Sequence, residues 1–97
     1  MGAPSTETAK EKDAIRRAMK HLAEKGWYHP PQNRGGTCVA LAIAEVTSDY
    51  ELELRARERF ARSAGLSSGS CTVIGSWNDH PDRTIAEVRA AMRKAAE

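Results

Sequence analysis

The residue with the greatest potential for chemistry is Cys38, which follows Gly35-Gly36-Thr37 at the start of a predicted helix. The dipole at a helix N-terminus favours the thiolate form of cysteine, and His29 or His80 would have to serve as the base of such a nucleophile. The predicted helix is apolar on every side, which favours burial of the thiol, and no catalytic-cysteine signature surrounds it. We therefore interpret Cys38 as a core residue and predict that the protein is not an enzyme.

The cysteine and histidine residues lack the spacing of a metal site. They are His21, His29, Cys38, Cys71 and His80, and no C-x-x-C or H-x-x-x-H pattern occurs among them. The sequence therefore predicts neither a metal nor a cofactor. The first residues lack the apolar core of a signal peptide, so reduced thiols and a cytoplasmic location are expected.

The segment 76–88 specifies local structure more strongly than any other stretch. Thr84 and Glu87 have the spacing of a capping box, in which each side chain bonds the other residue's backbone N–H. Asn78 and Asp79 are residue types whose short side chains bond nearby backbone groups. The segment predicts a polar loop that leads into a capped helix.

Trp77 stands at the start of this loop and invites two interpretations. We predict that it is largely buried against the central helix, since a large ring beside turn-forming residues can anchor a loop. Asn78 and Asp79 would then bond backbone amides of their own loop or of the loop after Gly26. In the competing interpretation, Trp77 is exposed and contacts a partner.

Arginines gather on one face of a predicted helix over residues 49–64. They are Arg55, Arg59 and Arg62, and together with the two-helix segment 38–64 they loosely resemble a helix-turn-helix. Glu51 and Glu58 lie among them and neutralise part of this charge, as on a solvated, ion-paired face. The arginines are candidate interaction residues, with DNA binding less favoured than protein binding.

Length and charge set the remaining limits. The chain has 97 residues, which indicates a single domain spanning residues 1–97. Its net charge of +2 is small for a nucleic-acid-binding protein. No apolar run is long enough to cross a membrane.

Apolar periodicity and end signals predict four helices, over residues 8–25, 37–46, 49–64 and 85–95. We expect an all-α, compact and irregular bundle in which 37–46 is the short, buried central helix. Residues 71–74 form a short strand or an extended segment in this prediction. Residues 1–5 are expected to be flexible.

Two of these helices carry more detailed predictions. The first should begin with a Thr8–Glu11 capping box, bury one apolar stripe and end at Gly26. The third should be capped by the residues Thr47-Ser48-Asp49 and end at Gly65. Its broad apolar face includes Tyr50, Leu52, Leu54, Ala56, Phe60, Ala61 and Ala64.

Three segments carry a resemblance to a known family. They are Gly26-Trp27, Gly36-Thr37-Cys38-Val39 at the start of an alanine-rich helix, and Trp77-Asn78-Asp79-x-Pro81-x-Arg83-Thr84-x-x-Glu87-Val88. In these segments the chain resembles a family of small proteins of unknown function that is common in actinobacteria and in the phages that infect them. The resemblance implies a viral or actinobacterial source and, because small phage proteins often act by binding a host protein, a protein partner.

Two principal hypotheses for function result. The first is a non-catalytic protein that binds a host or cellular protein. The second is a small DNA-binding regulator that uses its arginine-bearing helix faces. A cysteine-dependent enzyme comes third, and no hypothesis involves a membrane. The residues Trp27, Cys38, Trp77, Asn78, Asp79, Thr84 and Glu87 are assigned a structural role.

Overall fold

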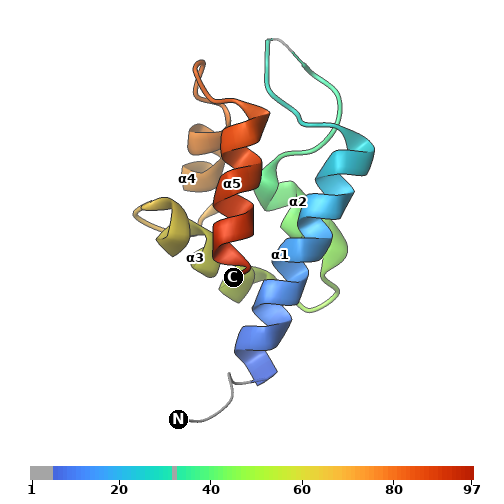
Figure 1. Ribbon diagram of the computed structural model, residues 1–97, viewed down its shortest axis with the longest axis vertical. Coiled ribbons are helices and arrows are strands. Elements are labelled where there is room, and N and C mark those ends of the chain that lie inside the picture. Colours follow the sequence, from blue (N-terminus) through green and yellow to red (C-terminus); the bar gives the residue numbers. More distant parts are fainter. Residues whose placement is uncertain (1–5, 32) are drawn as a thin grey trace.

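Five helices account for most of the described chain, residues 6–31 and 33–97 of a computed structural model (Figure 1). They are α1 (Thr6–Lys25), α2 (Val39–Val46), α3 (Tyr50–Ala64), α4 (Cys71–Asn78) and α5 (Ile85–Ala95). The all-α prediction is confirmed, and the four predicted helices are present as α1, α2, α3 and α5, whereas α4 is an additional helix. The predicted flexibility of residues 1–5 concerns a segment outside the described residues. None of the described helices combines the length and apolar character needed to span a bilayer.

The apolar stripe of α1 packs into the core as predicted. Ile15, Ala18 and Leu22 are buried at one-turn spacing, and the helix ends where Gly26 adopts a φ of +88°. The predicted capping box of this helix is wrong. The helix begins at Thr6, and the Glu11 carboxylate accepts a hydrogen bond from the Arg59 side chain on α3.

The second helix packs against α1, α3 and α4, and four of its eight residues are buried. Val39, Ala40, Ala42 and Ile43 are buried, which confirms the predicted core role of this segment. The prediction of burial on every side is wrong for Leu41, which is 49% exposed. A short helix packed against neighbours over part of its circumference still leaves one side to solvent.

The third helix begins and ends as predicted. The Asp49 carboxylate accepts the N–H of Glu51, and Gly65, at a φ of +75°, donates its N–H to carbonyls of the last turn. Phe60 is fully buried. The prediction that Tyr50 lies on the buried apolar face is wrong, because its side chain is 69% exposed.

The segment predicted as a strand at residues 71–74 is instead the start of α4. The Ser70 hydroxyl accepts the N–H of Val73 and caps the helix. Ile74 and Asn78 lie one turn apart and are both buried, so packing on this face outweighs the strand preference of the β-branched residues. Trp77 and Asn78 therefore belong to a helix, whereas the prediction placed them in a loop.

Hydrogen bonds join the two ends of the loop between α1 and α2. The Tyr28 N–H donates to Thr37 O at 2.9 Å, and the Thr37 N–H donates to Gly26 O at 2.8 Å. Gly36 makes this approach possible at a φ of +90°, since a Cβ atom there would lie 2.2 Å from Gly26 O. The two ends of the loop are thus held side by side.

Gly36→Ala should destabilise the protein more than Gly26→Ala. Both positions have a positive φ, which costs a non-glycine residue about 1–2 kcal/mol, but only at Gly36 would the new methyl group collide with backbone. We expect a loss of about 3 kcal/mol or more for Gly36→Ala, measured by urea denaturation. Equal losses for the two variants would contradict the close contact between the loop ends.

Candidate functional site

The side chain of Asn78 connects α4 to the loop after α1. Asn78 is 0% exposed. Its Oδ1 accepts the indole N–H of Trp27 at 2.7 Å, and its Nδ2 donates to Tyr28 O and to Asp79 Oδ1, each at 3.0 Å. Asn78 therefore bonds the backbone after Gly26, as predicted, although through a carbonyl group and not an amide. Asp79 accepts a bond from its neighbour Asn78.

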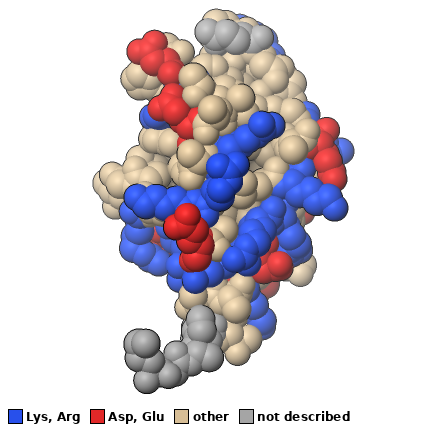
Figure 2. Space-filling view, in the orientation of Figure 1, with Lys and Arg blue, Asp and Glu red and all other residues tan. Residues whose placement is uncertain are grey.

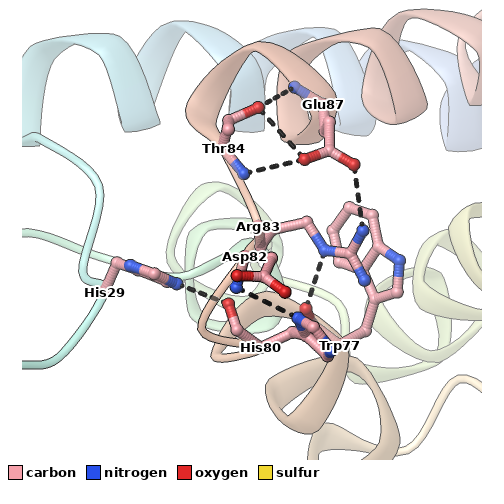
Figure 3. Close-up of polar contacts among 7 residues, drawn as sticks. All are labelled: His29, Trp77, His80, Asp82, Arg83, Thr84 and Glu87. Carbon is pink, nitrogen blue, oxygen red and sulfur yellow. Dashed lines mark hydrogen bonds and ion pairs between the residues drawn. The ribbon is translucent and has the colours of Figure 1, made fainter.

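Two histidines lie at the same junction, but they do not face each other. His29 is 4% exposed, stacks on the Trp27 ring at 4.2 Å and donates from Nε2 to His80 O at 2.9 Å (Figure 3). His80 Nδ1 accepts the N–H of Asp82 at 3.1 Å. These bonds place a proton on His29 Nε2 and leave His80 Nδ1 without one. Both rings therefore hold loop backbone in place.

Trp77 packs against the core with its ring edge and is covered by an arginine. Its ring meets Phe60 edge-on at 5.4 Å, while the Arg83 guanidinium lies 4.2 Å from the ring centroid (Figure 3). Arg83 Nε also donates to Trp77 O at 2.9 Å. Trp77 is partly buried, so the prediction of a largely buried ring is only partly correct: Arg83 takes the place of a second apolar surface.

The capping box at the start of α5 is confirmed. The Thr84 hydroxyl accepts the Glu87 N–H at 3.2 Å, and Glu87 Oε1 accepts the Thr84 N–H at 3.0 Å (Figure 3). The bond from the Thr84 backbone is the main reason that the pKa of Glu87 is lowered. Burial is the second-largest influence and raises this pKa, while the Thr84 hydroxyl and Arg83 each lower it.

The two cysteines lie in different surroundings. Cys38 is half-buried at the N-cap of α2, where its side chain makes no capping bond. Cys71 is exposed, and its Sγ accepts a hydrogen bond from Arg57 Nη1 at 2.9 Å. Within residues 6–31 and 33–97, the ring nitrogens of His29 and His80 bond loop backbone and neither thiol. No group of three or more His, Cys, Asp or Glu side chains in these ranges is placed to hold a metal ion.

The arginines proposed as interaction residues are largely engaged within the chain. Glu11, 7% exposed, accepts from Arg59 Nε at 2.8 Å and lies 3.5 Å from Arg55 Nε. Arg55 also pairs with Glu51 at 3.5 Å. Arg62 is exposed, and among the described residues no acidic group pairs with it. The structure thus brings Arg55 and Arg59 together around one carboxylate and leaves Arg62 available.

A groove lies beside this cluster, between α1 and α3. It encloses about 310 Å³ and is lined by Glu11, Leu54, Arg55, Glu58 and Arg62. Glu58 Oε1 accepts the N–H of Gly69 at 2.9 Å, which holds one wall in place. The groove therefore offers an apolar contact from Leu54 and a free guanidinium from Arg62 within one small volume.

Sequence reasoning missed the part that Glu11 plays in this groove. It assigned the residue to a helix cap, although Glu11 lies four residues before Ile15 on the stripe that also contains Ala18 and Leu22. A carboxylate on a buried stripe is a signal for a buried ion pair. The partner arginines lie about 45 residues away, so their identity was not readable from spacing.

The chain belongs to a family of unknown function (DUF6197), whose family model matches residues 6–97. Comparison with curated proteins and with solved structures finds no match. The family carries no activity from which a role could be transferred, so function has to be argued from the groove and the surface.

Asn78→Ala should destabilise the protein by about 2–4 kcal/mol, because the buried Trp27 N–H and Tyr28 carbonyl would both lose a partner. Urea denaturation measures this loss. Ser76→Ala, on the exposed side of the same helix, is the matched control and should change stability by less than about 0.5 kcal/mol. A near-wild-type Asn78→Ala protein would show that the junction contributes little.

Acidification should remove stability that Glu87 contributes. Its pKa in the folded chain lies below the ordinary value of 4.5, so the unfolded chain binds the proton first as the pH falls. The contribution is complete above the ordinary pKa and is lost as the pH falls through the lowered value. Glu87→Gln should therefore show a shallower fall in unfolding free energy below that pH than the wild type. Glu24→Gln controls for the loss of one exposed carboxylate, and an unchanged slope in Glu87→Gln would refute the prediction.

Proposed function

We propose that this chain is a non-catalytic domain that binds a protein partner, with partner side chains entering the groove between α1 and α3. The observation that carries the proposal is the combination of Leu54 with an exposed Arg62 in a groove of about 310 Å³. An apolar side chain next to an Asp or Glu, as protein surfaces provide, would satisfy both features. Arginine is also among the residues that contribute most to protein interfaces.

The carboxylates of the groove favour a protein over DNA. Glu58 lines the groove beside Arg62 and would repel the successive phosphates of a DNA strand, whereas a protein partner would need to bring only one carboxylate, to Arg62. Arg55 and Arg59 would have to leave Glu11, a buried carboxylate, before they could bind phosphates. A DNA-binding regulator therefore remains the alternative, with Arg62 as its available contact.

The resemblance to actinobacterial and phage proteins supports a specific kind of partner. In a chain of phage origin, the partner would be a protein of the host; in an actinobacterial chain, it would be another cellular protein. Both versions place the interaction in the cytoplasm. A cysteine-dependent enzyme is the least supported hypothesis, because the bonds of His29 and His80 go to loop backbone.

Affinity capture from an actinobacterial lysate, followed by mass spectrometry, tests the proposal. Wild-type protein should recover one specific protein, and Arg62→Glu should reduce its recovery at least about tenfold, which corresponds to about 1.4 kcal/mol of binding free energy. Arg34→Glu is the matched control, because Arg34 is exposed in the loop between α1 and α2. The control should recover the partner at the wild-type level.

Three results would contradict the proposal. Equal recovery by both variants would remove the groove from the interaction. Loss of the captured material after nuclease treatment would favour the DNA-binding alternative, as would a gel shift that strengthens as salt is lowered. Repeated failure to capture any protein would contradict protein binding itself.

A further inference from the structure

A second surface carries positive charge that the internal ion pairs leave uncompensated. We define the α1–α5 basic face by Lys12, Arg16 and Lys20 of α1 and Arg89 and Arg93 of α5. Four of these residues are exposed and Lys12 is half-exposed. Figure 2 shows blue Lys and Arg side chains gathered on the side where α1 and α5 lie in front, with fewer red side chains among them.

Helix geometry arranges these cations in two rows. Lys12, Arg16 and Lys20 follow one another at four-residue intervals, so they lie along one face about 6 Å apart. Arg89 and Arg93 form a similar pair on α5. Arg16 Nη2 donates to the backbone O of Ala96, the C-cap residue of α5, at 2.7 Å, three residues after Arg93. The two rows therefore meet at the Arg16–Ala96 bond.

The charge of this face exceeds that of the whole protein. The five cations compare with a net charge of +2 for the chain, so the remainder of the chain has a net negative charge. Within the described ranges, none of these five residues pairs with a carboxylate. The two acids next to Lys12 are engaged elsewhere, since Glu11 pairs with Arg55 and Arg59 and Asp13 binds Arg17 at 3.0 Å. The bond from Arg16 goes to a neutral carbonyl, and the exposed Glu24 and Glu97 lie at the outer ends of the rows, four residues after Lys20 and Arg93.

We infer that the α1–α5 basic face binds an acidic protein segment with an apolar side. Exposed alanines occur on both helices among the cations, and their methyl groups supply apolar contacts that phosphate backbones do not use. They are Ala9, Ala23, Ala86 and Ala90. The inference goes beyond the proposed function, because this surface is distinct from the groove.

Nucleic acid fits the same face less well. Neither α1 nor α5 contains Phe, Tyr or Trp, so the face offers no ring on which unpaired bases could stack. The α1 row spans only about 12 Å, and a longer polyanion would extend over the negatively charged remainder of the chain. A short acidic segment matches both the size and the charge of the face.

Fluorescence anisotropy of the full chain provides the test. The probe is a fluorescein-labelled peptide of repeating Glu-Glu-Leu-Ala, compared with its Lys-Lys-Leu-Ala counterpart and with a short mixed-sequence DNA duplex. The wild type should bind the acidic peptide most tightly, and binding should weaken when salt is raised from about 50 to about 200 mM.

Two triple variants with equal loss of charge localise the binding. The face variant is Lys12→Gln, Lys20→Gln and Arg89→Gln. The matched variant, with exposed cations on other sides of the same helices, is Lys10→Gln, Lys25→Gln and Lys94→Gln. We expect the Kd for the acidic peptide to rise about tenfold or more in the face variant and less than about twofold in the matched variant.

Each alternative outcome overturns the inference. Equal weakening in both variants would indicate a general charge effect, tighter binding of the duplex would indicate nucleic acid, and absence of peptide binding at low salt would leave the face without this ligand. Each variant should melt at the same temperature as the wild type, which would show that it folds. The Arg62→Glu variant should bind the acidic peptide as the wild type does. If this variant lost peptide binding, the peptide would be bound in the groove and not on the α1–α5 basic face. Failure of this inference and failure of the proposed function are therefore distinguishable.

Discussion

The packing of the loop after α1 against the end of α4 depends on the hydrogen bonds of one buried side-chain amide, that of Asn78. It joins α4 to Trp27 and Tyr28, which lie 51 and 50 positions earlier in the chain. Its oxygen and its nitrogen both have hydrogen-bond partners. Trp27 is held by this amide, and His29 stacks on Trp27 and reaches His80 O. Because a buried amide without partners is costly, one residue determines how the loop after α1 meets the end of α4.

The buried carboxylate of Glu11 has a comparable effect on the opposite part of the fold. A charge at this depth requires partners, and Arg55 and Arg59 of α3 provide them. Those arginines become part of the packing between α1 and α3, and their charge is used within the chain. Arg62 at the groove and the cations of the α1–α5 basic face are not used in this way, so internal ion pairing shapes both proposed interaction surfaces.

The sequence by itself determined the helices wherever a local signal specifies an end. Gly26 and Gly65 adopt the left-handed conformation that ends α1 and α3, Asp49 caps α3, and the Thr84–Glu87 box begins α5. These features depend on residues within one turn of each other, so spacing and residue type suffice to predict them. The buried stripe of α1 and the core role of α2 were also predictable, because the pattern of apolar residues within each segment indicates them.

Only the tertiary structure decided the features that depend on distant residues. Residues 71–78 form a helix because Ile74 and Asn78 together find a buried surface, although Thr72 and Val73 locally favour a strand. Tyr50 belongs to an apolar pattern but is largely exposed, and Trp77 is covered on one side by Arg83. Which arginines stay free was likewise set by Glu11, on another helix. Such outcomes follow from desolvation and partner satisfaction between segments far apart in the chain, which no local pattern records.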